Sequence, residues 1–394
     1  MPRLVTEYMP HLQELYLSTH PIHLVKFVLD RLPECIRTIR LGALRDDDSQ
    51  VDPDLIKRLD SGSQQRPRPR HHHALESLRF DNYLHGQEEY LLLPFLYTCS
   101  RKLTLFQNVQ AIRCFQNKAV HAALSRLGLT LKTLASVDLP HSIWSKDTHL
   151  AETISLSQDW TTLGLYQCYH AGFLTVSAIC GHCDHLQEIV LAGCSALGSK
   201  DLQTILCAAK NLRVFRAISD CEESDAIDPY LAAAEIIAGP EWATRSLERF
   251  ICKIEVPRHR SQVELGAVKT VWNGPSIEHC VNVQRQVFRE LAKQTRLRAL
   301  WLGLDSFSEQ RDIVRWAPCI WYSLEMTLKS GMGQLAVLKD LETLKVSRLN
   351  HHISVAELAW MAAAWPKLQN VEGVDFCEPE IAAWIDAHGP QWKK

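Results

Sequence analysis

The sequence has neither an excess of charge of one sign nor a long hydrophobic run. Its 43 basic and 45 acidic residues leave a formal net charge of -2 over 394 residues, of which 46% are hydrophobic. Binding to a phosphate backbone needs a basic excess, so this balance argues against nucleic acid as a partner. No stretch approaches the roughly 18 apolar residues of a membrane span, so we expect no membrane-spanning segment. The start of the sequence also does not resemble a secretory signal, because charges and prolines interrupt it at short intervals.

A cysteine framework and catalytic motifs are also missing. The 13 cysteines are odd in number and scattered over the whole length, which favours reduced thiols over disulfides. We therefore expect a cytoplasmic or nuclear protein. Because no GxSxG, P-loop or HExxH pattern is present, we predict no catalytic residue and no cofactor, and we do not expect an enzyme.

What the sequence does contain is a repeat of 26 residues. Four columns of side chains recur at this spacing between Trp160 and Ala217. The columns are Trp160, Leu186 and Leu212; Leu163, Ile189 and Phe215; Leu165, Leu191 and Ala217; and Cys168 and Cys194. A fixed period of this length is the signature of a stacked repeat architecture.

Each unit is predicted to be a short strand followed by a helix. Alternation through 189–191 points apolar side chains to one face of a strand. Apolar residues then fall at i, i+3, i+4 and i+7 from Val176, and again from Leu202, as on one side of a helix. We expect Ser199 to cap the second of these helices. Elements with a single apolar stripe can bury it only by stacking, which predicts one continuous core.

The same spacing recurs outside this stretch. Further LxxLxL patterns, complete or partial, are Leu12-Leu15-Leu17, Ile36-Ile39-Leu41, Leu75-Leu78-Phe80, Leu247-Phe250-Cys252, Leu297-Leu300-Leu302, Leu341-Leu344-Val346 and Leu368-Val371. Ahead of the last, Ser354 and Glu357 form a capping box for a helix that Pro366 should stop.

These columns resemble the cysteine-containing leucine-rich repeat of ribonuclease-inhibitor-like and F-box leucine-rich-repeat proteins. The stretch from Ser323 to Leu368 is similar to the C-terminal part of fungal proteins of this kind. The resemblance implies an α/β fold, a right-handed leucine-rich-repeat solenoid of about a dozen units with a parallel concave sheet and outer helices. It also implies a protein-interaction module that recognises substrates for an SCF-type ubiquitin ligase in ubiquitin-dependent catabolism. The alternative is a stand-alone scaffold or inhibitor with no ubiquitin role.

The F-box of that family is not recognisable in this sequence. The stretch LPECIRTI, from Leu32 to Ile39, resembles the LPxE opening of an F-box. However, Ile36, Ile39 and Leu41 continue the repeat columns 24 residues after those of Leu12, Leu15 and Leu17. We therefore predict that this stretch is a repeat.

We expect residues 1–394 to form a single solenoid with three insertions, at 45–74, 220–246 and 256–283. The first is polar, charged and rich in proline. The other two account for the long intervals between the LxxLxL patterns on either side of Leu247.

Two stretches contain residues that could bind a metal ion. CGHCDH, from Cys180 to His185, has CxxC spacing and two imidazoles, but Cys180 and Cys183 fall on the apolar stripe of a helix. The tract from His71 to His73 lies in a polar linker, where such tracts usually bind metal only adventitiously. RPRPR just before it is a candidate patch for nuclear import or an acidic partner. No metal site is predicted, and Cys168 and Cys194 are expected to pack in the core.

The binding face follows from the alternation along each strand. Side chains between the buried columns should point to the concave face, including Val190, Ala192 and Ile218. The candidate protein-binding residues are Tyr166, Glu188, Arg216, Arg249, Lys253, Trp301 and Lys345. Aromatic and arginine side chains often concentrate binding energy, so Tyr166, Arg216 and Trp301 are the expected anchors. The expected partner is a protein or substrate, with SCF components as further candidates.

Overall fold

The structure is a computed structural model that describes part of the chain. The described residues are 11–17, 32, 35–41, 75–80, 105–108, 133–137, 146–155, 160–166, 168–218, 228–257, 276–302, 323–346, 353–374 and 378–388. The chain divides into two compact units. The first comprises Met1–Cys168 and Ser177–His182, and the second comprises Tyr169–Val176 and Cys183–Lys394. The insertion expected at 45–74 and the His71–His73 tract lie outside the described residues, and a single solenoid over 1–394 stays a prediction.

The first unit contains a parallel sheet whose strands follow one another in chain order. They are β1 (Glu14–Leu17), β2 (Thr38–Leu41), β3 (Ser77–Phe80), β4 (Leu105–Asn108), β5 (Thr133–Val137) and β6 (Thr162–Tyr166). The register joins equivalent repeat positions, as in the pair Leu15 and Ile39. Because Ile36 and Ile39 are fully buried and β2 pairs with β1 and β3, the prediction that LPECIRTI is a repeat is confirmed. Before β6 comes helix α7 (Asp147–Ile154).

The second unit contains a parallel sheet of very short strands. They are β7 (Glu188–Val190), β8 (Val214–Arg216), β10 (Arg249–Ile251), β12 (Ala299–Trp301), β13 (Thr343–Lys345) and β14 (Asn370–Glu372). Every neighbouring pair is parallel and in repeat register. Each strand has three residues, so only the middle side chain points to one face while the outer two point to the other.

The core of the second unit consists of the predicted columns. The middle residues of the strands are Ile189, Phe215, Phe250, Leu300, Leu344 and Val371, each no more than 2% exposed. The columns that flank them, at Leu186 and Leu191 and their equivalents, are also buried. Phe215 and Phe250 stack with ring centroids 5.7 Å apart, and Trp242 stacks on Phe250 at 5.6 Å. At about 1.5–3 kcal/mol per buried side chain of this size, these columns are the main source of stability.

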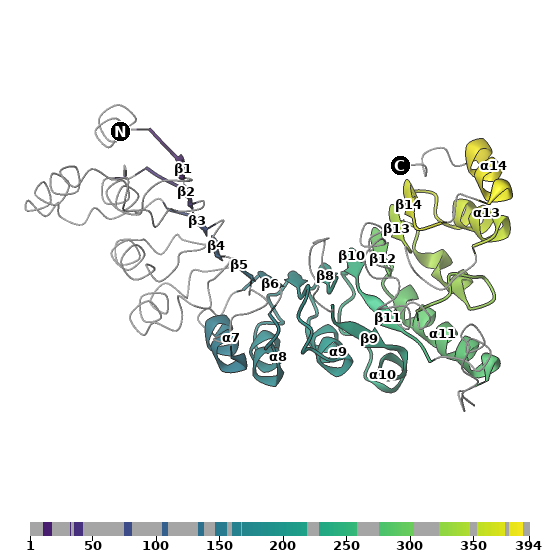
Figure 1. The fold of residues 1–394 in the computed structure, drawn as a ribbon, viewed down its shortest axis with the longest axis horizontal. Coiled ribbons are helices and arrows are strands. Elements are labelled where there is room, and N and C mark those ends of the chain that lie inside the picture. The colour runs from purple at the N-terminus through teal and green to yellow at the C-terminus, as the bar shows by residue number, and fades with distance from the viewer. Residues whose placement is uncertain are drawn as a thin grey trace, which may run out of the picture. The chain divides into compact units, whose positions relative to one another are not determined.

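Helices follow the strands in both units. Beyond α7 they are α8 (Phe173–Cys180), α9 (Ser199–Ala208), α10 (Ala233–Ala238), α11 (Ile277–Ala292), the 3-10 helix η6 (Met332–Val337), α13 (Val355–Ala364) and α14 (Pro379–His388). In Figure 1, α9, α10 and α11 lie along one side of the strands of the second unit. The predicted α/β leucine-rich-repeat solenoid is therefore the fold of this chain. Over the described ranges, no helix is both long and apolar enough to cross a membrane.

The N-terminal capping residue is as predicted in α13 and differs from the prediction in α9. Ser354 caps α13 in a capping box with Glu357, as predicted. In α9, however, the capping residue is Gly198, whose N–H donates to Asp201 at 2.9 Å. Ser199 is the first helical residue, and its Oγ accepts a hydrogen bond from Ala232 N at 2.7 Å. The hydroxyl therefore binds the chain of a later strand instead of its own helix.

Two of the expected insertions contain regular structure. From Asp228, the segment 220–246 forms β9 (Tyr230–Ala232) and α10, and Leu231 and Ile236 are buried. β9 pairs in parallel with β11 (Lys253–Glu255) in a separate two-stranded sheet, which is why the segment departs from the 26-residue period. Residues 277–283 of the third expected insertion belong to α11, whose apolar side is buried. The described parts of both segments are thus packed strand and helix, and their assignment as insertions stays a prediction.

Glu357 at the start of α13 binds two parts of the chain at once. One carboxylate oxygen accepts from Leu328 N at 3.1 Å, and the other accepts from Ser354 N at 3.1 Å and from the Ser354 hydroxyl. Partial burial raises the pKa of this carboxyl, but the hydrogen bonds outweigh burial and leave the pKa below its usual value.

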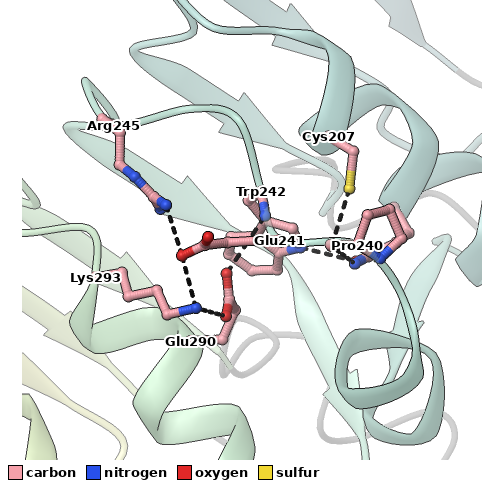
Figure 2. A network of polar contacts seen from close by, with 8 residues as sticks. Cys207, Pro240, Glu241, Trp242, Arg245, Glu290 and Lys293 are labelled. Atoms are coloured by element: carbon pink, nitrogen blue, oxygen red, sulfur yellow. Dashed lines mark hydrogen bonds and ion pairs between the residues drawn. The ribbon is translucent and has the colours of Figure 1, made fainter.

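Polar contacts join α9, the segment after α10 and α11 (Figure 2). The Trp242 indole Nε1 donates to Gln203 Oε1 at 2.8 Å, and Gln203 Nε2 donates to Pro240 O at 3.2 Å. On the outside of this network, Glu241 pairs with Arg245 at 2.6 Å and with Lys293 at 2.8 Å. Hydrogen bonds from Lys293 and then Arg245 hold the pKa of Glu241 below its ordinary value. The exposed ion pairs contribute little, so the buried Trp242–Gln203 bond is the part that matters for stability.

We predict that Trp242→Phe lowers the free energy of unfolding by about 1–3 kcal/mol, because it leaves the buried Gln203 oxygen without a donor. The phenyl ring keeps the stack on Phe250. Gln203→Leu in the same chain removes the unpaired acceptor, so the double variant should be more stable than the sum of the two single changes implies. Urea unfolding of the four proteins measures this coupling, and strictly additive effects would contradict it.

Candidate protein-binding face

The face of the second sheet opposite its buried middle row is formed by two rows of side chains. One row contains Glu188, Val214, Arg249, Ala299, Thr343 and Asn370. The other contains Val190, Arg216, Ile251, Trp301, Lys345 and Glu372. We call these two rows the open face. Their side chains are held by a backbone whose middle row is fully buried, so their spacing is fixed.

Trp301 lies at the centre of the charged part of the open face. The Lys345 ammonium lies 4.0 Å from the centroid of the indole, on the neighbouring strand β13. The Arg249 guanidinium lies 6.0 Å from the same centroid, on the strand at the other side. A cation over an indole face is stabilised by the ring quadrupole, most strongly where water is partly excluded. Trp301 is half-buried, so it is both supported by two cations and still accessible.

The two cations beside Trp301 have different surroundings. Lys345 also pairs with Glu372 at 2.9 Å, and its side chain is only 17% exposed. Arg249 is exposed, and within the described part of the chain no carboxylate pairs with it. The indole Nε1 of Trp301 is buried and likewise has no acceptor there. A buried donor without an acceptor costs about 1–3 kcal/mol, so this arrangement is not the one that stability alone would favour.

The remaining predicted residues lie in three places. Glu188 and Arg216 are on the open face and half-buried, and Arg216 Nε donates to Ile218 O at 2.9 Å. Tyr166 is half-buried at the end of β6 in the first unit, where it pairs with Val137. Lys253 is not on the open face.

Lys253 leaves the open face because the chain changes sheets after β10. The Cys252 N–H makes the last hydrogen bond to the main sheet, to Trp301 O at 3.0 Å. Lys253 then pairs with Tyr230 in the small sheet of β9 and β11, with its ammonium 5.8 Å from the Tyr230 ring centroid. Alternation of side chains along the strand predicted that Lys253 lies on the same face as Arg249 and Ile251. Alternation holds, however, only while the strand stays in one sheet.

Three side chains predicted to be exposed on this face are buried. Val190, Ala192 and Ile218 are 5%, 1% and 5% exposed. Arg216, the register neighbour of Val190, folds its side chain onto the backbone of Ile218. The turn after Ala192 is bound by Asp228, whose carboxylate accepts from Gly193 N at 2.7 Å. Arg216 and Asp228 therefore both bind the backbone that follows β7 and β8.

Glu372 is the one member of the charged cluster that sequence reasoning missed. The side of the strand on which Glu372 lies could be predicted, since it follows the buried Val371 in the last repeat. Its pairing with Lys345 was not readable, because it depends on the register between β13 and β14.

No disulfide joins any two of the described cysteines. Cys168 and Cys194 are fully buried, which confirms their predicted packing role, and burial raises the pKa of the Cys252 thiol. In CGHCDH, Cys180 is half-buried and Cys183 is 3% exposed. Within the described ranges, no group of three or more histidine, cysteine or acidic side chains could hold a metal ion.

No protein-family model and no curated protein matches the chain. Among solved structures, it is similar to the yeast complex of Rad7 and Elc1, at 15% identity and a TM-score of 0.44, over 86% of this chain and 71% of that chain. It is also similar to the leucine-rich repeat-containing protein LegL7 from Legionella pneumophila, at 11% identity and a TM-score of 0.39, over 97% and 99% of the two chains. A leucine-rich-repeat protein of Leptospira interrogans aligns at 10% identity with a TM-score of 0.25, over 98% and 96%. These likenesses are too distant to bear on function.

We predict that the protein binds no structural zinc. Replacing Cys180 and Cys183 together by alanine should lower the free energy of unfolding by about 1–3 kcal/mol, through lost packing. Zinc content measured by mass spectrometry should be the same, and far below one equivalent, before and after the change. Cys207→Ala is the matched control. One equivalent of zinc that disappears in the double variant would contradict the prediction.

Proposed function

We propose that the chain is a protein-binding module that recognises its partner through the open face of the second unit. Tyr166 of the first unit is a separate candidate binding residue. The observation that carries the proposal is Trp301, an accessible indole held between Arg249 and Lys345. Tryptophan and arginine are the side chains most enriched at the energetic centres of protein interfaces.

The buried row beneath the open face holds its side chains in place, which favours a role in recognition over that of a surface that only contacts solvent. The middle residues directly below the open face, Phe250, Leu300 and Leu344, are fully buried. Binding therefore orders few side chains, and the loss of conformational entropy on association is small.

A more specific form of this proposal is substrate recognition for an SCF-type ubiquitin ligase, in the cytoplasm or nucleus. It is supported by the resemblance of the repeats between Trp160 and Ala217, and of Ser323 to Leu368, to F-box leucine-rich-repeat proteins. The second candidate is a stand-alone scaffold or inhibitor, which the same binding face would serve without ubiquitin transfer.

We expect the combined variant Tyr166→Ala, Arg216→Glu and Trp301→Ala to lose partners that the unchanged protein captures from cell extract. Each truncated anchor should weaken binding by about 2 kcal/mol, roughly 30-fold, because such residues carry most of the interface energy. Quantitative affinity mass spectrometry measures the loss.

Lys200→Glu is the matched control, because it reverses an exposed charge on α9, away from the open face. All proteins should melt at the same temperature within a few degrees. Retention of every partner by the combined variant would rule out the open face as the recognition surface.

The ligase role predicts that the adaptor and cullin subunits of an SCF ligase co-purify with the protein. It also predicts that the half-life of a captured partner lengthens when the protein is removed from cells. Capture of the partner with no ligase subunit and an unchanged half-life would favour the scaffold or inhibitor.

A further inference from the structure

The charges of the open face are distributed unevenly. Arg216, Arg249 and Lys345 supply three cations, and the carboxylate of Glu372 is already bound to Lys345. The other acidic side chain of the face, Glu188, lies on β7, two strands away from Arg249. The region around Trp301 therefore presents more positive than negative charge, although the whole chain has a net charge of -2.

The register gives this region a definite length. Arg216 on β8 and Lys345 on β13 occupy the same row, three strands apart, with Trp301 between them. Neighbouring strands are about 4.8 Å apart, so the row from Arg216 to Lys345 spans about 14 Å. An extended peptide rises about 3.3 Å per residue and covers this distance with about four residues.

Arg249 is the group in this region that most needs a partner. Its guanidinium is exposed, and among hydrogen bonds, ion pairs and ring interactions its one partner in the described structure is the Trp301 ring, with the centroid at 6.0 Å. A guanidinium binds a carboxylate through two parallel hydrogen bonds, and such charge-assisted bonds are roughly twice as strong as neutral ones. Covering this face with a neutral partner would desolvate Arg249 without compensation, and this disfavours a neutral occupant.

We infer that the open face binds an extended acidic segment of a partner protein, which runs across β8 to β13 with a carboxylate on Arg249 and an apolar side chain on Trp301. This inference rests on the proposed function and adds the chemistry of the partner. A peptide is favoured over nucleic acid, because three cations near two glutamates give too few phosphate contacts for a nucleic-acid interface.

Glu372 then acts as an internal competitor. Its carboxylate occupies Lys345, and it repels an acidic ligand that approaches this end of the row. Removing the charge with Glu372→Gln releases the lysine to the ligand and should tighten the binding of an acidic peptide. If Glu372 had a purely structural role, this substitution would not increase the affinity for an acidic peptide.

The test uses the full chain and fluorescein-labelled peptides followed by fluorescence anisotropy. The acidic probe is EEDLEDEE, and its matched neutral control is QQNLQNQQ. The acidic probe should bind at least tenfold more tightly than the neutral one, and added NaCl should weaken it. Arg249→Gln should weaken the acidic probe at least tenfold, Glu372→Gln should tighten it about threefold, and Lys200→Glu should leave it unchanged.

Each contrary result is decisive. Equal binding of both peptides, no binding of EEDLEDEE, or no effect of Arg249→Gln overturns the inference. Two further probes are a DNA duplex and QQSLQSQQ phosphorylated on both serines, and tighter binding of either than of EEDLEDEE also overturns it. If the acidic peptide fails but the variant of the three anchors still loses its cellular partners, the proposed function stands and only the acidic specificity is wrong.

Discussion

The structure of the second unit depends on stacking the buried middle residue of each strand in strict parallel register. Each strand has only three residues, so a single middle residue anchors it to the core. Ile189, Phe215, Phe250, Leu300, Leu344 and Val371 lie side by side in this row. A slip by one residue would expose the whole row and bury the charged positions on either side. The register is therefore enforced by the hydrophobic effect.

The same constraint determines where function can be located. Middle positions are committed to the core, and so are buried outer positions such as Val190 and Ile251. The remaining outer positions are the ones that can vary in chemistry without loss of the fold. Arg249, Trp301 and Lys345 all occupy outer positions, on three successive strands of the sheet. Their proximity is a product of stacking, since 44 residues or more separate Trp301 from its neighbours on the adjacent strands. The cluster therefore forms only when three successive repeats stack, and no single repeat contains it.

The fold could be predicted from the sequence wherever the columns are complete, and the site only in part. The LxxLxL positions of Leu247, Leu297 and Leu341 all begin repeats whose strands lie in the main sheet. Strands β4 and β5 were not predicted, because their residues Leu105–Asn108 and Thr133–Val137 lack a clear LxxLxL pattern. Lys253 was misplaced because its orientation depends on β9, more than twenty residues earlier. Local alternation reports which way a side chain points within a strand and cannot report where the strand leaves its sheet.

Glu357 shows how neighbouring repeats can share one polar group. The same carboxylate accepts from Leu328 N, before η6, and from Ser354 N, at the start of α13. Its pKa is lowered in the folded protein, so the stability that it contributes is present above the unfolded pKa and is lost as pH falls through the folded pKa. Protonation would weaken both attachments in a single event. Acid below the usual pKa of a glutamate would therefore loosen the turn before η6 and the first turn of α13 together, as one cooperative segment of the chain.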